Sequence, residues 1–195
     1  MTRDAEYTRR LLRAQGARWK KLLDVQAPYR WNLQRLRPGS TLEVGCGVGR
    51  NLSHLRGAGV GIDHNPYSVE VCRRAGLVAF TPEEFSRSPH DAPALFDTLL
   101  FSHLAEHMRF GEFVDLVRRH VYLLKTDGRI VVMTPQEAGF RSDPTHVEFF
   151  DFAKVRAAIE QVGFSPIREY SFPFPRLVGR IFRYNEFVSI SRRRN

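Results

Sequence analysis

From Thr41 onward, short apolar segments alternate with helical segments, and this alternation constrains the fold more than any other feature of the sequence. The apolar segments are short and bounded by glycine or turn residues, which predicts strands at 41–45, 59–63, 77–80, 96–102 and 128–134. Apolar residues at helical spacing follow in 51–57, 68–76, 110–125 and 150–163. Such alternation is typical of a doubly wound α/β sheet. Two further strands, 166–174 and 185–193, have no helix between them, so we predict an antiparallel hairpin at the sheet edge.

The residues before this alternation are expected to be helical. Apolar residues recur at helical spacing in 8–26, Pro28 interrupts the pattern, and a second helical stretch covers 29–36. We therefore predict one domain over residues 1–195, with a helical cap at 1–38 and a core at 39–195.

Composition limits the class of protein. No apolar run approaches the roughly 20 residues that span a bilayer, and the first residues lack the apolar centre of a signal peptide, so we expect no membrane span and a cytoplasmic location. Only two cysteines occur, Cys46 and Cys72, which excludes a disulfide framework and a cysteine zinc site. Any metal must be held by histidine and carboxylate.

The net charge of +9 and the isoelectric point near 10.1 raise the question of a nucleic-acid partner. Most of the positive charge is arginine, and its densest runs lie near the two ends of the chain. A basic surface by itself does not specify a ligand. A small-molecule or oligosaccharide acceptor is therefore the first expectation, and nucleic acid is the alternative.

The stretch "LEVGCGVGRNL" runs from a predicted buried strand into Gly45, Gly47 and Gly49 and then into a helix. Glycines at such a turn allow positive φ and a close approach of the backbone to a ligand. Asp63 ends the next strand, where a carboxylate accepts hydrogen bonds from ribose hydroxyls in nucleotide-binding sheets. Position 50 is arginine, so the spacing differs from the dinucleotide fingerprint.

This loop, together with "GIDHN", "FDTLLFSHLAEHM" and "LLKTDGRIVVMTP", resembles the ordered motifs of the class I S-adenosylmethionine-dependent methyltransferases. The resemblance implies a Rossmann-like sheet of seven strands with a carboxyl-terminal hairpin and extra amino-terminal helices. It also implies S-adenosyl-L-methionine as the cofactor. The positions that would then contact the cofactor are Glu43, Gly45, Cys46, Gly47, Gly49, Asp63, His64, Thr81 and Ser102. Thr81 stands where the family often has an acidic residue near the adenine.

The stretch "FSHLAEHMRF" places His103, Glu106 and His107 at positions i, i+3 and i+4, which share one face of a helical turn. His146 lies in "TPQEAGFRSDPTHVEF", a loop that follows the fifth predicted strand. We predict that these four residues form a metal site at the carboxyl edge of the sheet. His54, His90 and His120 have no partners in the sequence and are expected at the surface.

The four residues resemble the E-x-x-E-H…H metal site of small-RNA 3′-terminal 2′-O-methyltransferases, with His103 in place of the first glutamate. Magnesium or manganese is the expected ion, although nitrogen ligands by themselves favour manganese, iron, cobalt or zinc. His146 is the candidate general base, and His103 is the second candidate catalytic residue.

A divalent ion that chelates two adjacent hydroxyls favours O-methylation of a diol. The whole chain is also similar to compact, metal-dependent sugar O-methyltransferases of methylmannose-polysaccharide type. We therefore expect methyl transfer to a sugar hydroxyl. Two alternatives remain open, an RNA ribose 2′-O-methyltransferase and a non-catalytic protein that binds the cofactor.

Overall fold

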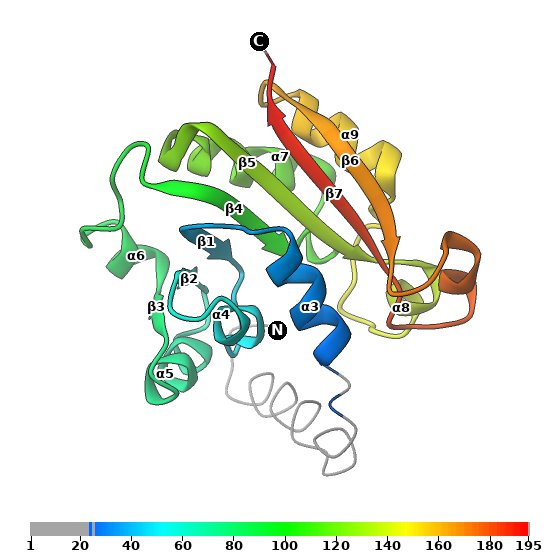
Figure 1. Ribbon diagram of the computed structural model, residues 1–195, viewed down its shortest axis with the longest axis horizontal. Coiled ribbons are helices and arrows are strands. Elements are labelled where there is room, and N and C mark those ends of the chain that lie inside the picture. Colours follow the sequence, from blue (N-terminus) through cyan, green and yellow to red (C-terminus); the bar gives the residue numbers. More distant parts are fainter. Residues whose placement is uncertain (1–23, 25, 195) are drawn as a thin grey trace. The chain divides into compact units, whose positions relative to one another are not determined.

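The computed structural model describes residue 24 and residues 26–194, which belong to two compact units, residues 1–92 and 93–195 (Figure 1). We call them the amino-terminal and the carboxyl-terminal unit. The predicted helix at 8–26 and most of the predicted cap at 1–38 lie outside the described residues. The prediction of a single domain therefore stays a prediction.

The amino-terminal unit is built from a parallel sheet and short helices. In chain order its elements are α3 (Ala27–Arg35), β1 (Thr41–Val44), α4 (Arg50–His54), β2 (Gly59–Ile62), α5 (Pro66–Arg74), β3 (Val78–Phe80) and α6 (Pro82–Phe85). Strand β2 lies between β1 and β3, with Leu42 beside Val60 and Val60 beside Val78. All residues of β1 and β2 are buried, as expected for parallel strands that are covered on both faces.

The carboxyl-terminal unit holds the predicted hairpin. Its elements are β4 (Phe96–Ser102), η1 (Ala105–His107), α7 (Phe110–His120), η2 (Val121–Leu123), β5 (Leu124–Pro135), α8 (Glu137–Arg141), α9 (Phe152–Glu160), β6 (Phe164–Phe172), η3 (Arg176–Arg180) and β7 (Glu186–Arg193). Strands β4 and β5 are parallel, whereas β7 pairs antiparallel with both β5 and β6. This places β6 at the edge and confirms the hairpin.

The helix predicted at 110–125 is shorter in the structure. Helix α7 ends at His120, and β5 already begins at Leu124, where it pairs with Phe96 before a register shift. The apolar residues around Leu123 and Leu124 continue the helical pattern in the sequence, but their burial comes from the sheet. Tertiary pairing therefore overrides the local periodicity.

One apolar face of α7 anchors this unit. Phe113, Val114 and Val117 are buried, and the Phe113 ring makes edge contacts with Phe101 of β4 and Phe150, at centroid distances of 5.6 and 5.4 Å. Truncating a fully buried phenylalanine to alanine costs about 3–5 kcal/mol, so this contact is a main support of β4 and of the turn that follows it.

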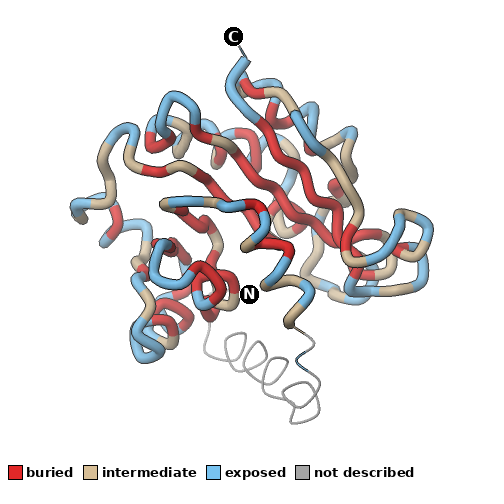
Figure 2. Tube along the Cα trace, viewed as in Figure 1, coloured by how far each residue is buried: buried red, intermediate tan, exposed pale blue. Residues whose placement is uncertain are grey.

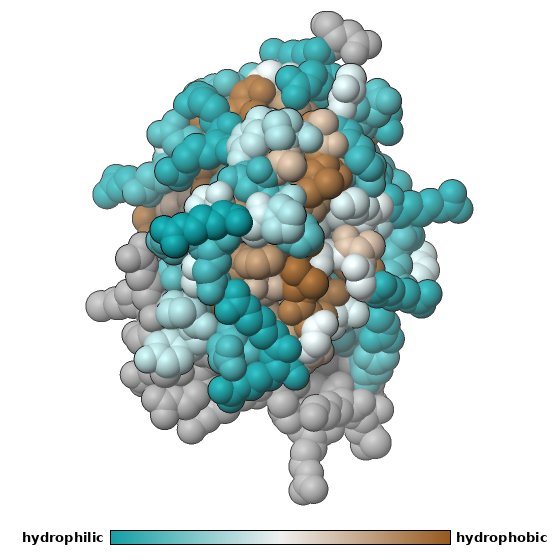
Figure 3. All heavy atoms as spheres, turned by 90° about the vertical axis from the view of Figure 1, so that its left-hand side faces the viewer, coloured by the Kyte–Doolittle hydropathy of each residue, from teal (hydrophilic) through white to brown (hydrophobic). Residues whose placement is uncertain are grey.

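The surface of the protein is mixed. On the face shown in Figure 3, brown hydrophobic patches are broken up by hydrophilic side chains. His54 was expected at the surface, but it is buried, with 7% of its area exposed, at the end of α4. Within the described residues, no helix is both long enough and apolar enough to cross a membrane.

Candidate functional site

The glycine loop follows the carboxyl end of β1 in the amino-terminal unit. Gly45, Gly47 and Gly49 all have left-handed backbone, with φ of 79°, 53° and 78°. At Gly49 a side chain is excluded as well, because a Cβ atom there would lie 2.6 Å from Leu77 Cδ1 and 2.9 Å from Cys72 Sγ. The loop conformation therefore requires glycine, as the sequence predicts.

Asp63 fixes this loop from the end of β2. Its Oδ2 accepts a hydrogen bond from the Gly47 N–H at 2.8 Å, and its Oδ1 accepts one from the Asn65 N–H at 2.8 Å. A carboxylate has about four acceptor positions, so these two bonds leave capacity for two hydroxyl donors. The exposed ring of His64 lies beside it, with Nδ1 3.9 Å from Asp63 Oδ1.

Several other predicted cofactor residues have structural contacts of their own. Glu43 is buried and accepts a hydrogen bond from Asn51 at 2.7 Å, which ties α4 to β1. The Cys46 thiol is also buried, and its contact with Cys72, together with burial, raises its pKa, so it is not a nucleophile here. Thr81 caps α6, because its hydroxyl accepts from the Glu84 N–H.

Ser102, the remaining predicted cofactor residue, belongs to the carboxyl-terminal unit and is buried at the end of β4. Its hydroxyl lies 3.9 Å from Met133 Sδ. Contact of any of these residues with the cofactor stays a prediction.

A separate cluster of predicted site residues lies in the carboxyl-terminal unit, where three of the four predicted ligands meet. Glu106 and His107 lie in the turn η1 after β4, and His146 lies in the loop after α8. Two backbone hydrogen bonds, from Val147 N at 2.7 Å and from Glu148 N at 3.2 Å to the Glu106 carbonyl, join the loop to the turn. One ligand atom from each of the three residues lies within 4.8 Å of the other two.

Both histidines of this cluster have a fixed tautomer. His107 Nδ1 lies 3.2 Å from the Thr145 carbonyl, and His146 Nδ1 lies 2.7 Å from the Phe140 carbonyl. Because a carbonyl only accepts, each Nδ1 must carry the proton, and each Nε2 keeps its lone pair. Burial lowers the pKa of His107, opposed by the charge of Glu106, so His107 is neutral at pH 7. Backbone support of this kind is common behind metal-binding imidazoles.

Glu106 gives this cluster its charge. It is 1% exposed, and neither of its carboxylate oxygens accepts a hydrogen bond. Its nearest cation is His103, whose Nδ1 lies 3.3 Å from Glu106 Oε1. A buried carboxylate is costly unless it is paired, and its contact with His103 is the pairing that the structure shows.

His103 is the predicted ligand that lies outside the group of Glu106, His107 and His146, although it contacts Glu106. The turn η1 is a 3-10 turn that begins after it, and His103 itself has left-handed backbone with φ of 53°. Its Nε2 lies 2.8 Å from Glu186 Oε1 on β7, so the ring lies between two buried carboxylates. Burial lowers its pKa, but Glu186 and Glu106 outweigh this effect and raise the pKa to about 9. A protonated ring has no lone pair, so His103 would have to lose a proton to act as a metal ligand or a base, and both roles stay predictions.

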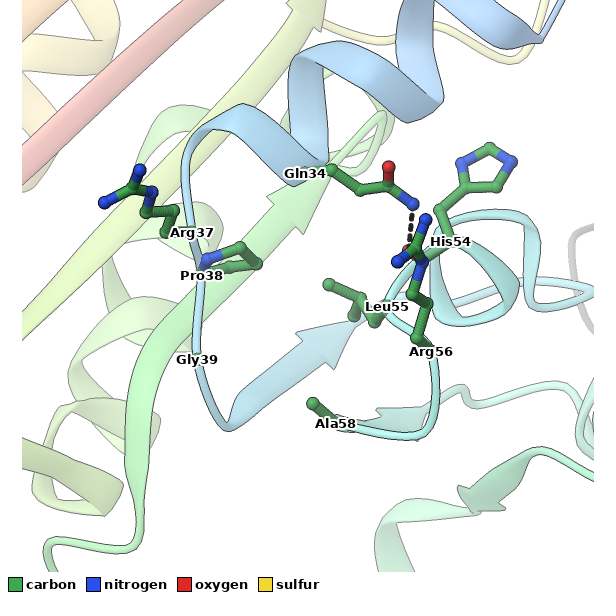
Figure 4. Close-up of a pocket in the computed structure, with 8 residues that line it drawn as sticks. All are labelled: Gln34, Arg37, Pro38, Gly39, His54, Leu55, Arg56 and Ala58. Carbon is green, nitrogen blue, oxygen red and sulfur yellow. Dashed lines mark hydrogen bonds between the residues drawn. The ribbon is translucent and has the colours of Figure 1, made fainter.

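A separate pocket of about 410 Å³ lies in the amino-terminal unit (Figure 4). Pro38, Leu55 and Ala58 line it together with Arg56 and Gln34, whose Nε2 donates to the His54 carbonyl at 3.1 Å. Its residues precede β1 and β2, whereas the glycine loop and Asp63 follow these strands. The pocket is therefore at the opposite edge of the parallel strands from the glycine loop.

Comparison with known proteins identifies the class. The sequence matches the methyltransferase domain family over residues 9–169, and the chain belongs to this family. No match was found among the curated proteins.

Solved structures of methyltransferases are similar to the chain over most of its length. A methyltransferase from Archaeoglobus fulgidus, described as SAM-dependent, is 17% identical, with a TM-score of 0.67 over 88% of this chain and 96% of that one. Magnesium protoporphyrin IX methyltransferase from Synechocystis PCC 6803, with bound SAH, is 15% identical, with a TM-score of 0.68 over 99% of this chain and 97% of that one. These likenesses confirm the predicted Rossmann-like methyltransferase fold.

Proposed function

We propose that this protein is an S-adenosylmethionine-dependent O-methyltransferase that uses a divalent metal ion to activate a sugar hydroxyl. The observation that carries the proposal is the buried Glu106 carboxylate, which has no hydrogen-bond partner and lies with one ligand atom each of His107 and His146 in a group whose atoms are within 4.8 Å of one another. Family membership supports methyl transfer, and the Glu106 cluster supports the choice of an oxygen acceptor.

The cofactor would be held by the glycine loop and Asp63. The left-handed glycines leave no side chain over the loop, and Asp63 keeps acceptor capacity for both ribose hydroxyls. S-adenosylmethionine supplies an electrophilic methyl group on a sulfonium. The protein's part in such a reaction is to hold the acceptor oxygen in line and free of its proton.

Glu106, His107 and His146 would hold the metal. One carboxylate and two imidazoles suit manganese, iron, cobalt or zinc better than magnesium. A bound divalent ion supplies Lewis acidity, which lowers the pKa of a hydroxyl and favours its alkoxide. His146 offers a single lone pair, at Nε2, which serves either as a ligand or as the proton acceptor. His103 would first have to release a proton to act as a base, because the two carboxylates raise its pKa to about 9.

Three protein ligands leave coordination positions for two oxygens of a vicinal diol, which sugars and ribose ends both present. The resemblance of the sequence pattern to sugar O-methyltransferases leads us to propose the sugar. The net charge of +9 favours RNA, which we keep as the alternative. The fold does not choose between them, because similar structures are named for acceptors as different as a porphyrin and a toxoflavin precursor.

The test is transfer of a tritiated methyl group to mannose oligosaccharides and to short RNA in parallel, with and without EDTA. We expect label in the sugar, loss of transfer in EDTA, and recovery with manganese, while calorimetry shows unchanged binding of S-adenosylhomocysteine. Undiminished transfer in EDTA would contradict the metal. Label only in RNA would select the alternative, and cofactor binding without transfer to any acceptor would select a non-catalytic protein.

A matched pair of variants locates the metal. Glu106→Gln should lose manganese binding and turnover, because it removes the one charged ligand of the cluster. Glu148→Gln is the control, since Glu148 lies in the adjoining loop and pairs with Lys154 at 2.8 Å. Equal loss of manganese affinity in both variants would show that the effect is not specific to the cluster.

A further inference from the structure

The loop between β6 and β7, residues 173–185, exposes aliphatic side chains. Ile181 is 86% exposed and Leu177 is 69% exposed, the two highest values among the large hydrophobic residues that the structure describes. Phe174 and Tyr184, at 47% and 42%, lie at the two ends of the same loop. We call Leu177 and Ile181 the aliphatic tip. Much of this loop is pale blue in Figure 2, beside α8.

The loop has an internal framework, so the exposure of the tip is not the result of an unsupported chain. The buried Asn185 side chain accepts from the Phe174 N–H at 2.9 Å and donates to the Phe174 carbonyl at 3.1 Å. Gly179 packs so closely on Gln136 that a Cβ atom would lie 1.7 Å from its Oε1. The Phe182 ring makes an edge contact with Phe174 at 5.3 Å. The loop is therefore held together by other residues, and the side chains of the aliphatic tip remain exposed.

The loop is also basic. Residues 173–184 contain three arginines and no acidic residue. Arg176 pairs with Glu137 of α8, but Arg180 and Arg183 are exposed. A further exposed arginine, Arg141, donates to the Arg180 carbonyl at 3.0 Å. Positive charge thus surrounds the aliphatic tip.

The combination of exposed aliphatic side chains and nearby arginines limits which kind of molecule can bind this loop. A second copy of this chain placed on the same loop would bring arginines against arginines, which disfavours a dimer through this loop. An anionic bilayer suits both features, since its headgroups attract arginine and its acyl boundary accepts aliphatic and aromatic side chains.

We propose that the β6–β7 loop docks the protein on an anionic lipid surface, with Leu177 and Ile181 entering the acyl boundary and Arg180 and Arg183 on the lipid phosphates. This contact is independent of the proposed metal and of the acceptor. It is a peripheral attachment through one loop.

The test is sedimentation of the full chain with vesicles of phosphatidylglycerol and phosphatidylcholine, compared with vesicles of phosphatidylcholine alone. We expect binding to the anionic vesicles only. The double variant Leu177→Ser with Ile181→Ser should reduce partitioning at least about tenfold, and Arg180→Gln or Arg183→Gln should each reduce it about fivefold. Ile167→Ser, at a β6 position that is 58% exposed, is the control and should bind like the wild type.

A second measurement reports insertion directly. Both native cysteines are buried, so an environment-sensitive dye can be attached selectively to Ile181→Cys and, as the control, to Ile167→Cys. We expect a blue shift on anionic vesicles for the first variant only. Equal shifts, equal binding to both kinds of vesicle, or unchanged binding of the serine double variant would overturn the proposal. So would a dimer in the analytical ultracentrifuge that the serine double variant abolishes, because the partner would then be a second copy.

Discussion

Replacing Glu186 by glutamine should lower the pKa of His103 and change how stability depends on pH. The glutamine keeps the shape of the side chain but removes the charge that lies 2.8 Å from His103 Nε2. Burial lowers the pKa of His103, and Glu186 is the largest opposing influence, ahead of Glu106; together the two carboxylates raise it to about 9. Without the Glu186 charge, only Glu106 counters the effect of burial, so the pKa of His103 should be lower.

The expected magnitude follows from that shift. The rise in the pKa of His103 from the ordinary value of 6.5 to about 9 is roughly 2.5 pKa units, which corresponds to about 3.4 kcal/mol at 1.36 kcal/mol per unit. The ring is 32% exposed, and solvent screening reduces this figure, so we expect about 1.5–2 kcal/mol. Because the folded pKa lies above the unfolded one, this stability is fully present below pH 6.5 and is lost as pH rises through about 9.

The assay combines an NMR titration of His103 with urea unfolding of metal-free protein between pH 6 and pH 10. In the wild type, the free energy of unfolding should fall by about 1.5–2 kcal/mol across the window from pH 6.5 to 9. In Glu186→Gln the pKa should drop by about one unit or more, and the fall should be smaller. Glu160→Gln, which removes only an exposed pair with Arg194, is the control. A wild-type pKa at or below 6.5, or one that Glu186→Gln leaves unchanged, would refute this account of His103.

Three further predictions concern the amino-terminal unit. Gly49→Ala should lower the free energy of urea unfolding by about 2–4 kcal/mol, because it adds a clash with Leu77 to the strain of left-handed backbone. Gly76→Ala, the control, is also left-handed but lies in open space and should lower it by about 1 kcal/mol. Equal costs for the two variants would exclude the clash. Asp63→Ala should weaken S-adenosylhomocysteine binding by at least about tenfold in calorimetry, and unchanged affinity would remove Asp63 from the proposed site. Burial lowers the pKa of His54 from 6.5 to about 4, so its contribution to stability is present above pH 6.5 and is lost as pH falls through 4. The melting temperature of the wild type should therefore decline over this pH range, and the decline should be smaller in His54→Leu. An identical decline in both proteins would contradict the prediction.

The contact between the glycine loop and Asp63 in the amino-terminal unit could be predicted because its signals are local. Parallel strands end at the same edge of a sheet, so the glycine loop after β1 and Asp63 after β2 had to lie close together, and Gly47 N indeed donates to Asp63 Oδ2. The positive φ of the glycines follows from the residue type. The buried tie between Glu43 and Asn51 has no comparable signal, because glutamate after an apolar residue fits many contexts.

The role of His103 could not be predicted for the opposite reason. Its decisive partner, Glu186, is 83 residues away in sequence and reaches it only because β7 pairs with β5. Helical spacing predicted that His103 would lie on the same face as Glu106, and His103 Nδ1 does lie 3.3 Å from Glu106 Oε1, although the chain passes through left-handed backbone at His103 before η1 begins. The second partner, Glu186, comes from a strand that the local spacing does not report.

The distribution of charge in the carboxyl-terminal unit bears on the choice between sugar and RNA. The net charge of the chain is positive, but the proposed metal ligands include the buried Glu106, and the adjoining loop carries Asp143 and Glu148. The nearest lysine of that loop region, Lys154, is paired with Glu148. A phosphate backbone needs unpaired cations close to the reacting hydroxyl, whereas a neutral sugar needs only hydrogen bonds and a chelating ion. Exposed arginines of this unit lie on the β6–β7 loop but also elsewhere, and Arg109 follows Glu106 by only three residues, so the charge near the Glu106 cluster keeps RNA as the alternative acceptor.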